Sequence, residues 1–145
     1  MAIATIALAA AIMMAVPGDA VSLEPGPHPL LGTWEGTVHI PDGDHQARFS
    51  FSRNGGFCLV AGGTGSGRWW RTGENRFSFK ALEKFHNEDG TFLGAVAVNQ
   101  AGVHRRGTFR SSGLSYYYDA DGNLEGSGVA TITATRVRRD ALHCR

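Results

Sequence analysis

Residues 33–53, TWEGTVHIPDGDHQARFSFSR, decide the fold class, because their apolar side chains recur at every second position. A period of two belongs to a β-strand with one buried face, whereas an amphipathic helix repeats about every 3.6 residues. Pro41-Asp42-Gly43-Asp44 interrupts the alternation with the residue types of a tight turn. The stretch therefore predicts two strands joined by that turn.

The same alternation continues along the chain, with short turn-like segments between the apolar runs. Residues 54–56 (Asn-Gly-Gly) are a strong hairpin signal, and the glycine-rich residues 62–67 are expected to bend. Further strands are expected at residues 76–85, 92–99, 103–110, 114–118 and 129–137, with turns at 100–102, 111–113 and 119–123. About eight strands without a helix predict an all-β, up-and-down antiparallel meander. A closed barrel is favoured over a sandwich, because closure removes exposed edges and a Greek-key sandwich needs a long crossing connection.

Length and charge limit the kinds of protein that the chain can be. Its 145 residues suit one domain, and its 20 glycines suit a fold with many turns. The formal net charge is +1, and the only basic clusters are Arg105-Arg106 and residues 136–139. Nucleic-acid binding needs a sustained basic surface. Solvated strand ends therefore explain these clusters better, and no nucleic-acid partner is expected.

The N-terminal segment differs from the rest, because residues 3–16 are apolar and uncharged. A membrane-spanning helix needs about 20 such residues, whereas the apolar region of a secretory signal is shorter. Gly18 and Ala20 suit cleavage after Ala20, although no Lys or Arg precedes the run. An uncleaved anchor and a buried helix are the alternatives. We expect a secreted protein, outside the membrane after cleavage, with a signal peptide at 1–20, an extended leader at 21–30, the barrel at 31–139 and a C-terminal tail at 140–145.

The two cysteines, Cys58 and Cys144, agree with export. In an oxidising compartment an even pair is expected to form a disulfide. The bond would tie the C-terminal tail to a strand near the middle of the chain and add roughly 4 kcal/mol of stability. Two unrelated thiols are the alternative.

The opening of the first strand, Leu31-Gly32-Thr33-Trp34, resembles that of lipocalins and their calycin relatives. In that group the tryptophan closes one end of the barrel, and an arginine of the last strand packs across its ring. The resemblance assigns these roles to Trp34 and to Arg136 or Arg138. Residues 118–123 and 130–136 also look like parts of small secreted lipocalin-like proteins from bacteria, and the likeness covers roughly residues 30–139.

A narrower resemblance links residues 28–36, HPLLGTWEG, to nitrobindin-type haem barrels. Those barrels bind haem through a histidine near the C-terminus, and only His143 is so placed here. His143 lacks the surrounding pattern of that family. We therefore expect no cofactor, with haem as the minor alternative.

Aromatic residues recur on the expected inner faces of the strands. The candidate ligand contacts are Phe49, Phe51, Trp70, Phe79, Tyr116 and Tyr118, with Trp69 as the alternative to Trp70. A packed core is the alternative, because a barrel of about eight strands is just wide enough to fill itself or to hold one small ligand. Small residues expected between the aromatics would leave volume unfilled: Gly36, Ala47, Gly94, Ala95, Ala97, Ala130 and Ala134.

No catalytic or metal-binding motif is present in the sequence. His39, His45, Asp42 and Asp44 flank one turn, but their spacing matches no established metal signature. The calcium-like run Asp119, Asp121, Asn123 lacks the distal glutamate of a full loop, so a tight turn is expected there. Glu83 or Glu88 would suit general acid–base work only if buried.

Three functions follow from this sequence. The favoured one is a secreted lipocalin-like barrel that binds a small hydrophobic or amphipathic molecule. The second is a protein-interaction or structural module with a filled barrel and an exposed apolar patch on one wall. The third is a cyclase or isomerase on the same barrel, for which a buried Glu, His or Arg in an open cavity would be the discriminating feature.

Overall fold

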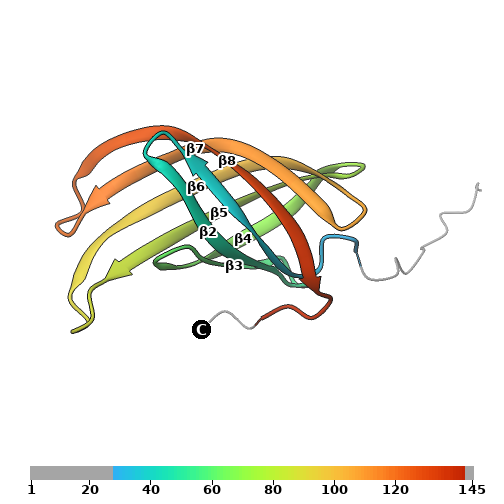
Figure 1. Cartoon of the computed structure of the whole chain (residues 1–145), viewed down its shortest axis with the longest axis horizontal. Coiled ribbons are helices and arrows are strands. Elements are labelled where there is room, and N and C mark those ends of the chain that lie inside the picture. Colours follow the sequence, from blue (N-terminus) through green and yellow to red (C-terminus); the bar gives the residue numbers. More distant parts are fainter. Residues whose placement is uncertain (1–27, 143–145) are drawn as a thin grey trace, which may run out of the picture.

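Eight antiparallel strands, each paired with its neighbours in sequence, close into a barrel through pairing of the first strand with the last (Figure 1). The computed structural model describes residues 28–142. Its strands are β1 (Gly32–Ile40), β2 (Gly43–Phe51), β3 (Gly56–Val60), β4 (Thr64–Gly73), β5 (Arg76–His86), β6 (Phe92–Arg105), β7 (Thr108–Asp119) and β8 (Leu124–Arg138). The predicted all-β, up-and-down barrel is confirmed. The described residues contain no helix that is long and apolar enough to cross a membrane.

The turns predicted at residues 100–102 and 111–113 are wrong, because β6 and β7 run through them. The chain reverses instead at Arg106-Gly107, where both residues have positive φ, at 50° and 78°. Positive φ at both central positions is the geometry of the tight hairpin turn that matches strand twist. Gly113 serves close packing rather than a turn, since a Cβ there would overlap the backbone carbonyl oxygen of Asn99.

The glycine-rich segment also differs from prediction. Only residues 61–63 connect the strands, and β4 begins at Thr64. Gly67 lies within β4, and a Cβ at this position would overlap the backbone carbonyl oxygen of Lys80 on β5. The final strand is likewise longer than the predicted 129–137, because it begins directly after the turn, at Leu124.

One end of the barrel is filled with aromatic side chains. Phe51 is fully buried at its centre, and Phe57 stacks on Phe79 with ring centroids 4.2 Å apart. Phe77 and Phe109 complete the packing around them. Such dense packing of large rings fixes this end of the barrel as a rigid base. We call it the closed end.

The residues before β1 cover the closed end. Pro29 and Leu30 form a turn, so the leader is not extended as far as residue 30, and Leu30 is fully buried. The Trp34 indole Nε1 donates a hydrogen bond to the Leu30 carbonyl oxygen at 2.8 Å. Arg136 lies over the Trp34 ring at 5.6 Å and donates to the Pro29 carbonyl oxygen at 2.6 Å. The predicted arginine–tryptophan contact is thus present, and Arg136 makes it rather than Arg138.

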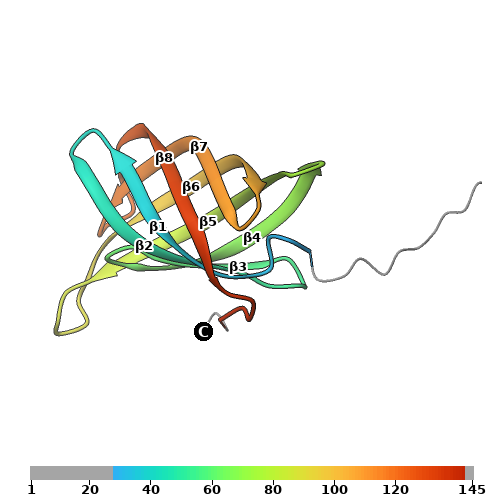
Figure 2. The same cartoon turned by 45° about the vertical axis from the view of Figure 1, so that its right-hand side comes forward.

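Residues 139–142 return to the closed end of the barrel, where residues 28–31 also lie (Figure 2). The Thr33 hydroxyl donates to the Asp140 carbonyl oxygen at 2.7 Å, and the Leu142 N–H donates to the Ser50 hydroxyl, also at 2.7 Å. Cys58 Sγ lies 3.9 Å from the Leu142 carbonyl oxygen. The predicted partner of Cys58, Cys144, lies outside the described residues, so the disulfide stays a prediction. The predicted signal peptide and His143 also lie outside them.

Candidate functional site: an open cavity in the barrel

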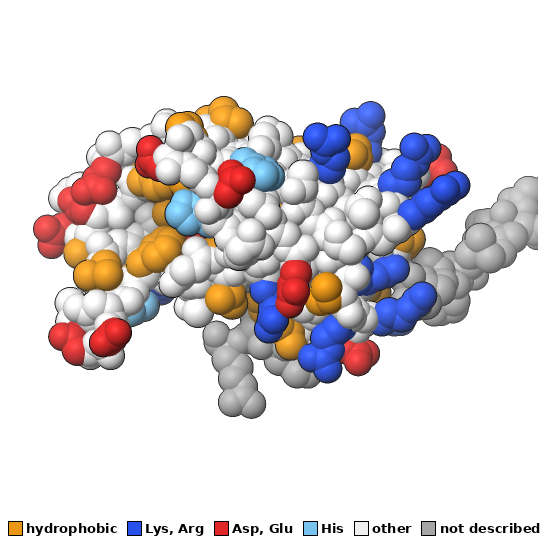
Figure 3. All heavy atoms as spheres, viewed as in Figure 1, with side chains coloured by type: hydrophobic (Ala, Val, Ile, Leu, Met, Phe, Trp, Pro, Cys, Tyr) orange, Lys and Arg blue, Asp and Glu red, His pale blue; other side chains and the backbone are white. Residues whose placement is uncertain are grey.

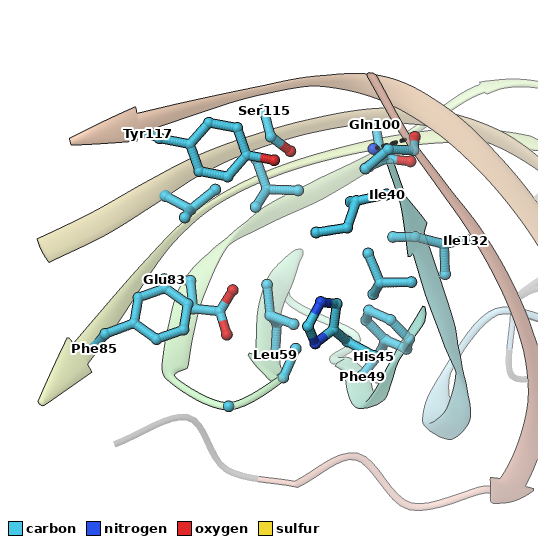
Figure 4. A pocket seen from close by; sticks show the side chains of 16 residues that line it. Ile40, His45, Phe49, Leu59, Glu83, Phe85, Gln100, Ser115, Tyr117 and Ile132 are labelled. Atoms are coloured by element: carbon cyan, nitrogen blue, oxygen red, sulfur yellow. Dashed lines mark hydrogen bonds between the residues drawn. The ribbon is translucent and has the colours of Figure 1, made fainter. Parts of the chain in front are cut away.

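The half of the barrel opposite the closed end is hollow. A cavity of about 440 Å³ opens there, among residues from β1, β2, β3, β5, β6, β7 and β8 (Figure 4). Most of its wall is apolar: Val38, Ile40, Phe49, Leu59, Ala61, Phe85, Val96, Val98, Ala130 and Ile132. A volume of this size falls in the range of small-molecule sites.

The cavity exists because the inner face changes composition along the barrel. Where β1 meets the closed end, its inner side chain is the fully buried Trp34, but further along the same face come Val38 and Ile40. On β6 the inner positions are Val96 and Val98, which are too small to reach across a barrel of eight strands. Rings fill one half, and aliphatic side chains line the other.

Glu83 is the one Asp, Glu, Lys or Arg among the described residues that line this cavity. Its side chain comes from β5 and is only 6% exposed. One carboxyl oxygen accepts a hydrogen bond from the Gly63 N–H at 3.1 Å, which anchors it to the β3–β4 connection. Burial raises the pKa of Glu83, and hydrogen bonds from the backbone of Gly63 and Ala61 oppose that rise. The site therefore holds a carboxyl group in apolar surroundings at a fixed position.

Other polar side chains complete the cavity wall. Gln100 is occupied within the protein, because its Nε2 donates to the Ala130 carbonyl oxygen at 3.2 Å and its Oε1 accepts from the Ser111 hydroxyl at 2.8 Å. Ser115 and Tyr117 bring two hydroxyl groups from β7, and hydroxyls both donate and accept hydrogen bonds. In Figure 4 the His45 ring and the Glu83 carboxyl point into the same space from β2 and β5.

Of the predicted ligand contacts, Phe49 alone lines the cavity within the barrel. Phe51 and Phe79 do lie on inner faces, but both are fully buried among other rings of the closed end. Phe51 and Phe79 therefore belong to the packed core, which was the alternative to ligand contact.

Trp70, Tyr116 and Tyr118 do not point into the barrel, so the expectation that they lie on inner faces is wrong for all three. Trp69 takes the inner position on β4, while Trp70 is 42% exposed and shares a shallow outer groove with Tyr116. On β7 the cavity residue is Tyr117, so its neighbour Tyr118, which pairs with Ala95, lies on the outer side.

The physical reason for the error on β7 is the absence of a turn at residues 111–113. In the unbroken strand, the buried Phe109 sets the alternation, which then passes through Ser111 and Ser115 to Tyr117. A one-residue change of phase exchanges the two faces of a strand. The same exchange on β6 places Ala95 and Ala97 outside, because Val96 and Val98 take the inner positions.

Of the polar residues that the sequence singled out at turns, His45 lines the cavity and the others do not. His39 pairs with Asp44 at 2.8 Å on the outer surface. Asp119 accepts hydrogen bonds from the Asp121 and Asn123 backbone N–H groups, at 2.9 and 2.8 Å, as expected for a tight turn. Within residues 28–142, no three His, Cys, Asp or Glu side chains are arranged to hold a metal ion.

From the sequence, Glu83 was a candidate general acid or base only if buried, and His45 was considered only as a possible metal ligand at the first turn. Gln100, Ser115 and Tyr117 were missed as cavity residues. The alternation from Phe109 would have found the last two, had β7 been taken as unbroken. No protein-family model matches this chain, and neither a curated protein nor a solved structure matches it.

Proposed function

We propose that this protein is a secreted, lipocalin-like carrier that binds one small hydrophobic or amphipathic molecule in the barrel cavity. The observation that carries the proposal is the open cavity of about 440 Å³, which has apolar walls and a few polar groups. Binding sites for small molecules combine these two features, since apolar area supplies affinity and polar groups fix orientation.

The arrangement of the rest of the barrel supports this proposal. The aromatic core of the closed end supplies the hydrophobic stabilisation of the barrel, so the half at the cavity mouth can stay hollow. The Arg136–Trp34 contact adds to the likeness to lipocalins at the opening of β1. Only one half of the barrel interior is filled with side chains. This arrangement fits a carrier better than an interaction module with a filled barrel.

A cyclase or isomerase is the second candidate, and Glu83 is the observation that favours it. A buried carboxyl with a raised pKa, facing an open cavity, has the properties of a general acid or base. Such an enzyme would lose turnover in Glu83→Gln while still binding its substrate. A carrier has no turnover to lose.

The experiment is a fluorescence titration with N-phenyl-1-naphthylamine, a neutral hydrophobic probe that brightens in apolar surroundings. We expect saturable binding of one probe per chain. Val96→Phe adds a ring inside the cavity and should weaken binding about tenfold or more. Ala97→Phe is the matched control, because Ala97 is the next residue on β6 and lies in an outer groove.

Two results would overturn the proposal. One is the absence of saturable binding by the folded wild-type protein. The other is equal loss of binding in Val96→Phe and Ala97→Phe, which would place the probe somewhere other than the cavity. Circular dichroism of both variants shows whether each keeps the barrel fold.

A further inference from the structure

Charge is divided between the two ends of the barrel. The connections around the cavity mouth, together with the adjoining strand ends, carry Asp42, Asp44, Glu88, Asp89, Asp119 and Asp121. Within four strand residues of these connections, Lys84 is the only Lys or Arg side chain in the described chain. Figure 3 shows a group of acidic side chains on the left, the side where Figure 1 places the β5–β6 and β7–β8 connections.

Arginines gather at the closed end instead, among them Arg53, Arg71, Arg76, Arg105, Arg106 and Arg138 (Figure 3). The net charge of +1 therefore hides a strong separation of charge along the barrel. A ligand that approaches the mouth meets a negative potential, which attracts cations and repels anions.

Inside the mouth, the Glu83 carboxyl adds a further acidic group to those around the rim. Glu83 is 6% exposed, and the two ion pairs found among residues 28–142, His39–Asp44 and Glu35–Arg48, do not include it. Its sequence neighbour Lys84 is exposed on the outside of the strand. An ionised carboxyl in apolar surroundings is stabilised most by a cation that comes to it with hydrogen-bond donors.

Resting on the proposed function, we infer that the cavity selects amphipathic cations: molecules with an alkyl or aryl body and an ammonium group that meets Glu83. The apolar wall takes the body of the ligand, and the acidic mouth steers its charge. His45 also lines the cavity and, if protonated, would favour an anion instead. The inference thus separates ligands of equal length by the charge of their head group.

The test uses three ligands with the same ten-carbon chain: decylamine, 1-decanol and decanoate. Each is titrated against bound N-phenyl-1-naphthylamine at pH 8, where an ordinary histidine is neutral. Decylamine should bind roughly ten- to a hundredfold more tightly than 1-decanol, the range expected for one charged hydrogen bond. Decanoate should bind more weakly than 1-decanol.

Glu83→Gln should remove most of the preference for decylamine and leave the affinity for 1-decanol close to that of the wild type. Its amide oxygen can still accept the Gly63 N–H bond, so the β3–β4 connection is kept. Glu88→Gln is the matched control, because Glu88 is an exposed residue of the β5–β6 connection outside the cavity lining. This variant should keep the preference almost whole.

The outcomes distinguish failure of the cation inference from failure of the carrier proposal. If N-phenyl-1-naphthylamine and 1-decanol bind but decylamine gains nothing, the cation inference fails and the carrier proposal stands. The inference also fails if Glu83→Gln and Glu88→Gln lose the preference equally. If the neutral probe does not bind at all, the carrier proposal fails and the inference fails with it.

Discussion

Replacing Phe51 with alanine tests the division of the barrel into a packed half and a hollow half. Phe51 is fully buried, and six aromatic rings surround it at centroid distances from 5.0 to 6.4 Å. Removing the ring leaves a cavity that these neighbours cannot collapse to fill, because they are held by each other. The comparison is Phe85→Ala, since Phe85 is only half-buried and lines a space that is already empty.

The expected magnitudes follow from burial and from the volume left behind. Phe51→Ala should lower the free energy of unfolding by about 4 kcal/mol, within the range for buried phenylalanines. Phe85→Ala should lower it by about 1 kcal/mol, because little new cavity forms and less apolar area is lost. For a domain of this size, a loss of about 4 kcal/mol lowers the Tm by roughly 16 °C.

Urea unfolding followed by tryptophan fluorescence, together with thermal melts, gives both values. Should Phe51→Ala fail to fold, Phe51→Leu provides a milder change at the same position, with an expected loss of about 1 kcal/mol. The reasoning is refuted if Phe85→Ala costs as much as Phe51→Ala. In that case the cavity wall, and not the aromatic end, would hold the barrel together.

Three other perturbations test particular features of the structure. Burial, and to a smaller extent the nearby Arg71 and His104, lowers the pKa of His28 from 6.5 to about 4. Between these two pH values the unfolded chain therefore binds a proton at His28 that the folded chain does not bind. Stability should therefore fall as pH drops from 6.5 to 4, and urea midpoints should show a smaller fall in His28→Gln. Gly113→Ala should lower the free energy of unfolding by about 2 kcal/mol, because the added methyl group would overlap the backbone carbonyl oxygen of Asn99. Gly126→Ala is the control: it has open space around it and should change the free energy of unfolding by less than about 0.5 kcal/mol. Equal effects of the two substitutions in thermal melts would contradict the close packing at Gly113. Protein exported by an expression host should show no alkylation of Cys58 or Cys144 by mass spectrometry under denaturing, non-reducing conditions, and labelling of both would disprove the disulfide.

The fold class could be predicted from the sequence because period-two alternation is a local signal. The first hairpin is the clearest example, since the chain does reverse within the predicted turn at residues 41–44, although β2 begins at Gly43 and pairs it with Ile40. The roles of Trp34 and Arg136 were also predictable, because they depend on short motifs at the two ends of the barrel.

The facing of individual side chains was harder to predict. Glycine has two uses in this barrel, and the sequence does not distinguish them. Gly107 supplies the positive φ of a turn, whereas Gly113 lets two strands approach closely. Taking Gly113 as part of a turn changed the phase of β7, and that error moved Tyr116 and Tyr118 into the predicted site in place of Tyr117.

The cavity itself depends on distances across the barrel, which no local pattern contains. Phe49 and Phe51 are two positions apart on the same face of β2, yet one lines the cavity and the other is buried among rings. The difference arises from the strands on the far side. The burial of Glu83 has the same origin: its hydrogen bond to Gly63 forms beside the β4–β5 pairing, but the cavity that encloses it also needs residues from β1, β2, β7 and β8.

The most direct test of whether a small ligand enters the barrel is to map where it binds. The measurement is a series of ¹H–¹⁵N correlation spectra of the isotope-labelled protein during titration with N-phenyl-1-naphthylamine. We predict that the amide signals of Val96, Tyr117 and Gly63 shift in a saturable way, because Val96 and Tyr117 line the cavity and the Gly63 N–H donates to the cavity residue Glu83. Shifts confined to the outer groove of Trp70 and Tyr116, or no shifts at all, would contradict the account.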